Sequence, residues 1–293
     1  MERFSSSSPK PAEVMLGKLE QRYEQLSFSG GGLRCFWQGG ALDALTEVRT
    51  IAPERIAAAS GGVLSAACFI SGCGEKLIDA FCERLRRHDH NVVPGAVVDG
   101  REITPHEQIY RDVVADVLDA KACKAVAEGP AFEVLLAEPP DWLPTMAAAA
   151  LTMVLYEADK HVRSTPHGRW AQAAGAREVR IDGRKAAREG ALVELVCKAA
   201  TIPPIFELAS HDGRPVIDAG TVDNAPMPQG DKGNTLVLLT RSYRNLPEVE
   251  GRTYLFPSHA TEADKMDFTD AEALRAAYSQ GRSDMESLLA QIG

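Results

Sequence analysis

Residues 28–40 read FSGGGLRCFWQGG, so three consecutive glycines, Gly30, Gly31 and Gly32, follow a short apolar strand. Glycine has no Cβ atom, and a loop built from it can fold closely around a ligand with its backbone N–H groups unobstructed. N–H groups that converge on one point stabilise the oxyanion that forms during acyl transfer. The stretch therefore predicts an oxyanion hole at the end of a strand.

Nucleotide-binding loops also follow strands, but their spacing differs from that of this stretch. A dinucleotide-binding fingerprint needs a further glycine three places after Gly32, where this chain has Cys35. A P-loop ends in Lys followed by Ser or Thr, and no such pair closes the segment. Both nucleotide interpretations are weakened, and a tight turn without a ligand is the alternative for the glycines alone.

Ser60 stands between two segments of different character. Residues 55–59, RIAAA, are expected to form a short buried strand, and residues 63–70, VLSAACFI, have helical composition. A nucleophile elbow joins a strand to a helix in this way, and its sharp turn requires small residues two places before and after the nucleophile. Ala58 and Gly62 occupy those places. The pattern favours a nucleophilic serine, with a helix N-cap as the alternative.

A second candidate catalytic side chain, Asp218, follows a hairpin signal. The pair Asp212-Gly213 is typical of a two-residue hairpin turn, and residues 215–217, PVI, are expected to form the strand after it. This strand would place Asp218 at its C-terminal end, where open α/β sheets bind their ligands. A turn without a chemical role is the alternative for residues 218–220 taken alone.

Three motifs of this chain resemble, in their order, those of the patatin-like phospholipases: a glycine loop that ends in Arg34, a serine elbow and a late Asp-Ala-Gly turn. Residues 199–206, AATIPPIF, are similar to an Ala-Ser-x-x-Ile-Pro-x-x-Phe stretch of that family. The resemblance covers most of the chain and implies a three-layer α/β/α fold around a central, mostly parallel sheet. The chain departs from the family pattern at Ala58 and Ala219, where glycine is usual.

The resemblance implies a Ser-Asp dyad, in which Ser60 is the nucleophile and Asp218 accepts its proton. An acyl ester would form on Ser60, and water would then release the fatty acid. The oxyanion would be stabilised by the backbone N–H groups of Gly30, Gly31, Gly32 and Gly61. The supporting residues that the motifs imply are Arg34, Gly62 and Gly220. This chemistry requires no metal ion or other cofactor.

The expected activity is hydrolysis of fatty acyl esters in phospholipids or lysophospholipids, and three alternatives are open. One is a histidine triad, because α/β-hydrolases place histidine after the acidic residue and His259 follows Asp218. The second is a soluble carboxylesterase or thioesterase that acts on small acyl esters. The third is a catalytically silent lipid- or protein-binding protein. For Arg34, the alternatives are positioning of the loop, orientation of a lipid phosphate and a structural salt bridge.

Charge and hydropathy restrict the partners. The chain has 293 residues and a formal net charge of −9, which argues against nucleic acid and against a broad basic face for anionic membranes. Peripheral membrane contact is therefore expected to be local and apolar. The most apolar stretch, residues 146–156, is too short to span a bilayer, which needs about 20 residues. Nothing in the sequence indicates the oligomeric state.

The N-terminal segment is rich in serine and then charged, without the basic start and apolar core of a signal peptide. The six cysteines show no paired metal-ligand spacing and are typical of small buried residues in a reducing compartment. These features predict a cytoplasmic protein without a bound metal.

We expect a disordered tail at residues 1–11 and a single hydrolase domain at residues 12–293. An amphipathic helix is expected at residues 12–25, and a helical segment around residues 91–170. Within that segment, residues 130–156 combine prolines with large apolar side chains, which indicates a lid over the serine; helices packed on the sheet are the alternative. Further strands are expected at residues 179–181, 235–240 and 253–256, before C-terminal helices at residues 271–292.

Overall fold

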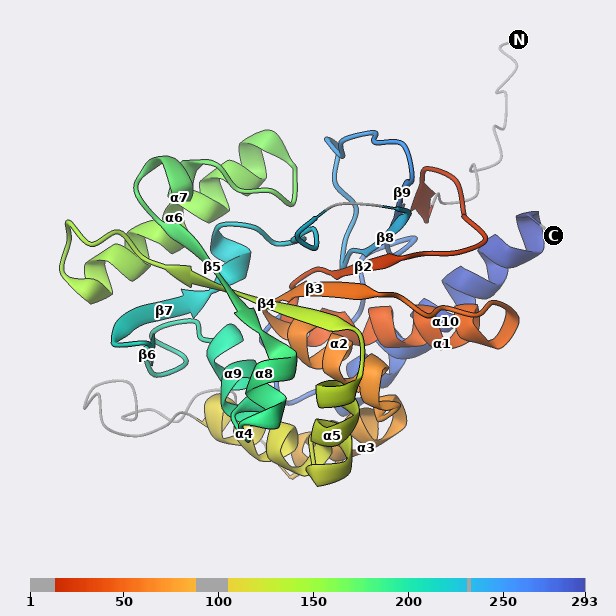
Figure 1. The fold of residues 1–293 in the computed structure, drawn as a ribbon, viewed down its shortest axis with the longest axis horizontal. Coiled ribbons are helices and arrows are strands. Elements are labelled where there is room, and N and C mark those ends of the chain that lie inside the picture. Colours follow the sequence, from red (N-terminus) through yellow and green to blue (C-terminus); the bar gives the residue numbers. More distant parts are fainter. Residues whose placement is uncertain (1–13, 88–104, 231–232, 293) are drawn as a thin grey trace, which may run out of the picture.

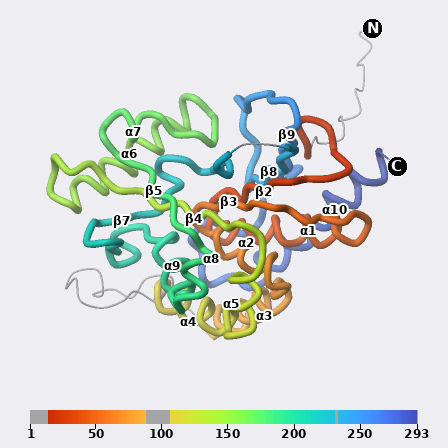
Figure 2. Tube along the Cα trace, viewed as in Figure 1, coloured from red at the N-terminus to blue at the C-terminus, as the bar shows by residue number. Residues whose placement is uncertain are grey.

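The computed structural model describes residues 14–87, 105–230 and 233–292. The expected tail at residues 1–11 and part of the expected helical segment, residues 88–104, lie outside the described residues. The described chain forms an α/β fold in which helices cover both faces of one sheet (Figure 1, Figure 2).

A mixed sheet of nine strands runs through the described part of the molecule. Its centre is parallel, in the order β9-β8-β2-β3-β4, and its edges are antiparallel. The predicted α/β fold is confirmed, and the parallel strands occupy the centre of the sheet. The strands are β1 (Met15–Leu16), β2 (Gln25–Phe28), β3 (Arg55–Ala59), β4 (Ala131–Glu138), β5 (Arg177–Asp182), β6 (Ala209–His211), β7 (Arg214–Asp218), β8 (Thr235–Leu238) and β9 (Arg252–Leu255).

The two faces of the sheet carry different numbers of helices. In Figure 1, α6 and α7 lie above the sheet and the other labelled helices lie on the opposite side. The largest apolar cluster of the molecule involves these other helices and the sheet. The helices are α1 (Phe36–Val48), α2 (Gly61–Ser71), α3 (Gly74–Leu85), α4 (Pro105–Val117), α5 (Ala120–Glu128), α6 (Thr145–Arg163), α7 (Trp170–Ala173), α8 (Gly183–Arg188), α9 (Leu192–Ala199) and α10 (Ala271–Ile292), with short 3-10 turns η1 (Gly32–Cys35) and η2 (Ala219–Thr221).

Helix α1, which follows the glycine loop, is anchored by close packing against α10. A Cβ atom at Gly40 would lie 2.0 Å from the carbonyl oxygen of Tyr278, and one at Gly281 would lie 2.1 Å from that of Trp37. Only glycine allows the two backbones to approach so closely. Trp37 Nε1 also donates a 2.8 Å hydrogen bond to the buried carboxylate of Asp284. The glycine loop is therefore continuous with a helix that is fixed in the core.

The expectation of a helical segment around residues 91–170 is wrong for residues 131–138, which form the central strand β4. This strand lies between β3 and β7, and Phe132, Leu135 and Leu136 are buried in the sheet rather than in a lid. A strand that is buried on both faces has no polar alternation, so its pattern does not distinguish it from a buried helix. The helix within the expected lid, α6, begins at Thr145.

The expectation of an amphipathic helix at residues 12–25 is also wrong. From residue 14 onward this segment forms β1 and an irregular connection that leads into β2. Leu19 and Tyr23 are buried, and Tyr23 Oη donates a 3.0 Å hydrogen bond to Thr253 Oγ1 in β9. Tertiary contacts with the sheet thus override the local helical pattern.

Three local predictions are confirmed. Strand β3 has the expected bounds, and α10 occupies residues 271–292 as one helix. Strands β6 and β7 form a hairpin whose turn residues, Asp212 and Gly213, have φ values of 50° and 76°. Two left-handed residues in succession are typical of the type I′ turn that Asp-Gly predicts.

Candidate active site

Ser60 lies at a sharp turn between β3 and α2, as the elbow pattern predicts. Its φ of 54° and ψ of −140° are strained for a residue with a side chain, and such strain is typical of functional turns. A Cβ atom at Gly62 would lie only 2.5 Å from the carbonyl oxygen of Ser29, so glycine is required at this place of the elbow. The turn sets Ser60 at the carboxyl end of a central parallel strand.

The register of the sheet brings Asp218 to the same level as Ser60. Ala59, the last residue of β3, pairs with Leu135 of the parallel strand β4. The next residue of β4, Leu136, pairs with Asp218 of β7, which runs antiparallel to β4. Two strands of opposite direction therefore end at one place, with Ser60 directly after β3 and Asp218 as the last residue of β7.

The two side chains form a direct hydrogen bond in a buried site. Ser60 Oγ donates to Asp218 Oδ2 over 2.5 Å, and each residue is only 3% exposed. The N–H of Gly220 donates to Asp218 Oδ1 over 2.7 Å, and the N–H of Asp218 donates to the carbonyl oxygen of Thr201 over 2.8 Å. Because the backbone holds one carboxylate oxygen, the other is directed at the serine hydroxyl.

Burial raises the pKa of Asp218, because a carboxylate loses its hydration in the protein interior. The positive charge of Lys265 and the hydrogen bonds from Ser60 and Gly220 oppose this shift. A raised pKa makes the carboxylate a stronger proton acceptor than an exposed aspartate. Such a change favours proton transfer from serine, for which an ordinary carboxylate is a weak base.

The glycine loop is fastened to the loops after β7 and β8. The carbonyl oxygen of Gly30 accepts hydrogen bonds from Asn224 Nδ2 over 3.2 Å and from Thr240 Oγ1 over 2.8 Å. The N–H of Gly30 donates to the carbonyl oxygen of Asn224 over 2.9 Å. A Cβ atom at Gly30 would lie 2.6 Å from that of Ser60, so the loop lies directly against the elbow.

The N–H of Gly30 is therefore already used, whereas those of Gly31, Gly32 and Gly61 are free. Within the described residues, none of these three N–H groups donates a hydrogen bond. The two elements that carry them are in contact, since a Cβ atom at Gly61 would lie 2.9 Å from the carbonyl oxygen of Gly32. Free N–H groups beside a serine hydroxyl can stabilise an oxyanion.

Arg34 braces the same loop. Its Nε donates to the carbonyl oxygen of Gly31 over 3.3 Å. No carboxylate in the described part of the chain forms an ion pair with Arg34, so the geometry does not support the salt-bridge alternative. The rest of the guanidinium group is available to an anionic ligand.

The two alanines that replace glycine in the family motifs fit their places. Ala58 and Ala219 are fully buried, and Ala219 packs with Ala59 and Leu135. Neither alanine has a positive φ, so a Cβ atom is compatible with the backbone at both. The hydrogen bond between the serine and the aspartate is formed with both alanines present.

Histidine takes no part in the contacts of the dyad. Among the described residues, no histidine forms a hydrogen bond with Ser60 or Asp218. His259 Nδ1 instead lies 2.8 Å from Ser258 Oγ, at an exposed position. The geometry therefore does not support the histidine triad.

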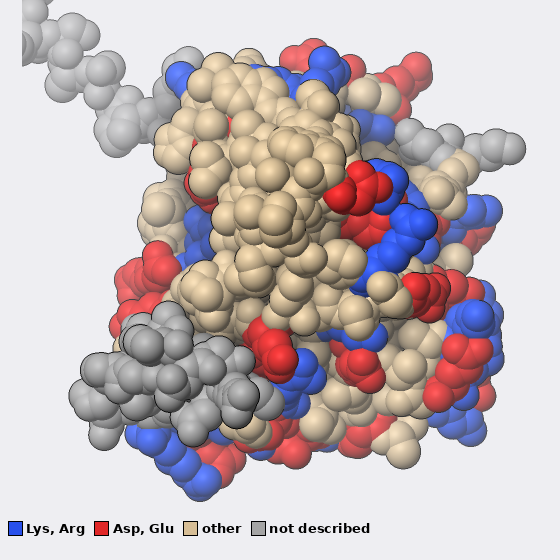
Figure 3. Space-filling model, turned by 90° about the vertical axis from the view of Figure 1, so that its left-hand side faces the viewer, with Lys and Arg blue, Asp and Glu red and all other residues tan. Residues whose placement is uncertain are grey.

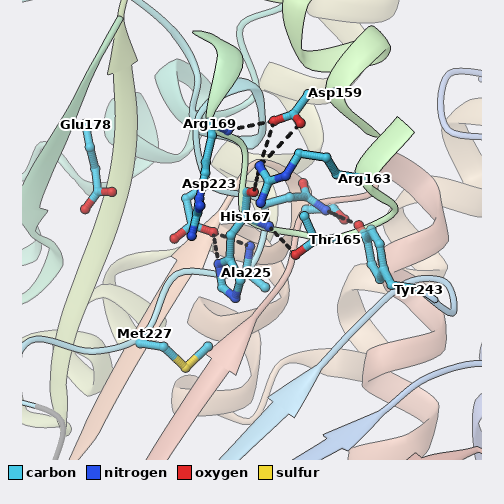
Figure 4. Close-up of polar contacts among 12 residues, drawn as sticks. Asp159, Arg163, Thr165, His167, Arg169, Glu178, Asp223, Ala225, Met227 and Tyr243 are labelled. Carbon is cyan, nitrogen blue, oxygen red and sulfur yellow. Dashed lines mark hydrogen bonds and ion pairs between the residues drawn. The ribbon is translucent and has the colours of Figure 1, made fainter. Parts of the chain in front are cut away.

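A different histidine, His167, supports the acidic loop, and the sequence offers no spacing that would single it out. His167 Nδ1 lies 2.9 Å from Asp223 Oδ1, and the two residues also form an isolated β-bridge (Figure 4). The same carboxylate oxygen accepts a 3.1 Å hydrogen bond from the N–H of Ala225. These contacts hold the turn that contains Asn224 and thereby the glycine loop.

An apolar cavity of about 40 Å³ lies next to Ser60. Ser60 and Gly61 line the cavity at its polar end. Its apolar walls include Phe36, Leu64, Phe81, Phe206, Met266 and Phe268.

The sequence matches a known protein family. The family described as patatin-like phospholipase matches residues 26–230, a range that contains the glycine loop, the elbow and Asp218. The chain belongs to the patatin-like phospholipase family. Membership indicates lipid acyl hydrolase activity in general and a lipid substrate.

No curated protein matches the sequence. The crystal structure of VipD from Legionella pneumophila matches with a TM-score of 0.48 at 12% sequence identity, over 98% of this chain and 72% of that chain.

The described residues include no candidate metal site and no helix that could span a membrane. They contain no group of three or more His, Cys, Asp or Glu side chains that could hold a metal ion. None of the described helices has the length and apolar character needed to cross a membrane. All six cysteines are free thiols, four of them buried.

Proposed function

We propose that this patatin-like protein hydrolyses fatty acyl esters of phospholipids or lysophospholipids through a Ser60-Asp218 dyad and an acyl-enzyme intermediate. The observation that carries this proposal is the buried 2.5 Å hydrogen bond from Ser60 Oγ to Asp218 Oδ2, beside three free glycine N–H groups. A nucleophile, its base and an oxyanion site within contact distance are the minimal apparatus of acyl transfer.

In the first half of the reaction, Ser60 Oγ attacks the ester carbonyl carbon and its proton passes to Asp218 Oδ2. The N–H groups of Gly31, Gly32 and Gly61 stabilise the tetrahedral oxyanion, and loss of one such donor typically costs about 3–4 kcal/mol. As the ester C–O bond breaks, the leaving alcohol takes the proton from Asp218. The acyl group remains on Ser60.

In the second half, Asp218 removes a proton from a water molecule, whose oxygen attacks the acyl carbonyl carbon. The second tetrahedral oxyanion forms at the same N–H groups. When it collapses, the bond to Ser60 Oγ breaks and the hydroxyl recovers the proton from Asp218. The fatty acid leaves, and the dyad returns to its starting state.

An apolar surface on α6 supports local contact with a lipid surface. Figure 3 shows a broad area without charged side chains on the side of the molecule that carries α6 and α7. Large apolar side chains of this region are exposed, including 65% of Val154 and 53% of Met146. The others are Trp142, Val162 and Trp170. Exposed apolar areas of this kind mark protein or membrane interaction sites. Met153, Tyr156 and Glu157 of the same helix line a pocket that Asp218 also lines.

The proposal is tested by incubating the purified protein, without added calcium, with phospholipids, lysophospholipids and short acyl esters. Released fatty acid is measured by mass spectrometry beside Ser60→Ala. The matched control is Ser65→Ala, which removes a hydroxyl from the wall of the same cavity. We expect release by the native protein and by Ser65→Ala, and none by Ser60→Ala.

Other outcomes distinguish the alternatives. Preference for short acyl esters over long-chain lipids would indicate a carboxylesterase or thioesterase. Absence of release from every substrate, with a cooperative melting transition that shows folded protein, would indicate a binding role. Release that persists in Ser60→Ala would contradict the assignment of the nucleophile.

A further inference from the structure

A cluster of cationic side chains lies on the other side of the glycine loop from the apolar cavity. One recess is lined by Gly30 and Gly31 and by four cations, Arg34, Lys160, Arg241 and Lys265. The cations come from the glycine loop, α6, the segment after β8 and the segment before α10. Such a concentration of positive charge is unexpected in a chain whose formal net charge is −9.

Three of these cations have no carboxylate partner. Within the described residues, none of Arg34, Arg241 and Lys265 forms an ion pair with a carboxylate, whereas Arg163, Arg177 and Arg180 do. Lys160 is paired with Glu157 at 2.5 Å. Burial lowers the pKa of Lys160, and the charges of Arg241 and Lys265 lower it further while Glu157 opposes the change. The cations therefore repel one another, and an anion in the recess would relieve that repulsion.

Contacts with aromatic and polar side chains hold the cations in position. The Arg241 guanidinium lies over the ring of Tyr243, with Cζ 4.3 Å from the ring centroid. Tyr243 Oη accepts a 3.1 Å hydrogen bond from Asn224 Nδ2, which also donates to the carbonyl oxygen of Gly30. Lys160 Nζ lies 5.2 Å from the centroid of the Tyr156 ring. Arg241 is thereby linked to the loop that would hold the oxyanion.

The two sides of the site suit the two ends of an amphiphile. Lys265 lines both the apolar cavity, which Ser60 also lines, and the cationic recess, so the two regions meet at Lys265. An acyl chain in the cavity would place its ester at Ser60 and its leaving group toward the recess. Arginine and lysine at short range are suited to phosphate, to which guanidinium groups bind in a planar fork.

We propose that this recess, in an enzyme with the hydrolase function proposed above, binds a phosphate group in the leaving group of the substrate. Arg241, Lys160 and Lys265 with Arg34 are then specificity-determining residues that select phosphate-bearing acyl esters over neutral ones. The phosphate can belong to a terminal monoester or to a diester headgroup, and the choice of substrate distinguishes these two sources.

The experiment compares three octanoyl esters that stay monomeric in solution: octanoylglycerol, its 3-phosphate and its 3-phosphocholine. The measured quantity is the ratio of kcat/KM for each phosphate-bearing ester to that for octanoylglycerol. We expect the native ratio to exceed one and to fall about tenfold in Arg241→Met, through KM rather than kcat. The matched control is Arg244→Met, which removes an exposed charge three residues away, outside the recess.

A second variant predicts a change in the opposite direction. Glu157→Gln removes the carboxylate that competes for Lys160, so the ratio should rise severalfold. A larger change for the 3-phosphate than for the 3-phosphocholine would assign the recess to a terminal monoester, and equal changes would assign it to a diester. A native ratio of one, an unchanged ratio in Arg241→Met, or an equal fall in Arg244→Met would each overturn the assignment.

Binding measurements separate this assignment from the hydrolase function. Ser60→Ala protein is titrated calorimetrically with octanoylglycerol 3-phosphate and with octanoylglycerol. We expect the phosphate ester to bind more tightly than octanoylglycerol. The ratio of the two dissociation constants should be about tenfold smaller in Ser60→Ala/Arg241→Met. If the native protein hydrolyses no ester, tighter binding of the phosphate ester still supports phosphate binding in the recess, without the hydrolase function. Equal binding of the two esters contradicts phosphate binding in the recess.

Discussion

The two regions that flank the glycine loop differ in chemistry and in origin. On one side, the apolar cavity is part of the main core, where side chains of α2, α3 and α4 such as Leu64, Phe81 and Tyr110 converge. On the other side, loops and one helix bring together Arg34, Lys160 and further cations around a small recess. The proposed site therefore has a direction, with an acyl chain on one side and an anion on the other.

The largest effect on hydrolysis is expected at Asp218, because every substrate depends on this carboxylate whichever side of the glycine loop it contacts. Asp218→Asn should lower kcat about 10³–10⁴-fold for every ester, because an amide cannot take the serine proton. The loss should be the same for phosphate-bearing and neutral substrates, since the dyad acts on the ester alone. Steady-state kinetics on the octanoyl esters measure this, and an unequal loss would show that Asp218 also takes part in selectivity.

The same variant should not lose stability. Because burial raises the pKa of Asp218, the folded protein binds this proton more readily than the unfolded chain does. The free energy of unfolding therefore falls as pH rises through the raised pKa. At neutral pH the ionised carboxylate of Asp218 thus destabilises the folded protein. Thermal melting at pH 7 should give a Tm for Asp218→Asn that is no lower than that of the native protein.

The pH profile follows from the same shift. The base must be ionised, so kcat/KM should fall as pH decreases through the pKa of Asp218. We expect the midpoint of this fall above 3.8, the ordinary value for aspartate. A midpoint at or below 3.8 in the profile for octanoylglycerol, with the protein folded, would contradict the described burial of the carboxylate.

A substitution in the loop between the two sides should have the next largest effect. In Gly30→Ala the added Cβ atom would lie 2.6 Å from the Cβ atom of Ser60 and from Asn224 Oδ1, so the loop must shift. We expect kcat to fall about 10²-fold as the oxyanion N–H groups move. Gly74→Ala is the control, because its Cβ atom would meet no atom within 4 Å. Equal kinetics for the two variants would contradict the close contact between loop and elbow.

A smaller effect is expected on the outer surface of α6. Val154→Asp places a charge on a side chain that is 65% exposed, so it should not disturb packing. If α6 contacts lipid, hydrolysis of phospholipid vesicles should fall severalfold while hydrolysis of monomeric octanoyl esters stays unchanged. Val48→Asp, at a 63% exposed position of α1, provides the control. A fall with both kinds of substrate would show that α6 acts on the dyad rather than on the lipid surface.

The three elements of the candidate site could be predicted because each is a local pattern. The glycine loop, the elbow at Ser60 and the turn at Asp218 each occupy a few consecutive residues whose backbone needs are visible in the sequence. The structure places the three together, with a hydrogen bond between Ser60 and Asp218. Prior use of the Gly30 N–H by Asn224 could not be predicted, because it depends on a contact across 194 positions.

The rest of the site lacked such patterns. The sequence predicts a helical segment where strand β4 lies, since residues 134–137 are all buried and lack the alternation that marks a strand. Lys160, Arg241 and Lys265 come from separate elements, and no spacing relates them to each other or to Arg34. The pairing of His167 with Asp223 likewise arises only where the segment after α6 and the turn after β7 meet in the folded chain (Figure 4).

The smallest effect is expected within the apolar side itself. Met266 lines the cavity and is flexible and half-buried, so Met266→Ala should widen the cavity at a modest cost in stability. Preference among acyl chains should then shift severalfold toward longer chains, measured as kcat/KM over a series of glycerol esters. The ratio between phosphate-bearing and neutral octanoyl esters should stay the same, because Met266 does not line the cationic recess. A joint change of chain length and phosphate preference would mean that Lys265, its neighbour in the chain, couples the two sides of the site.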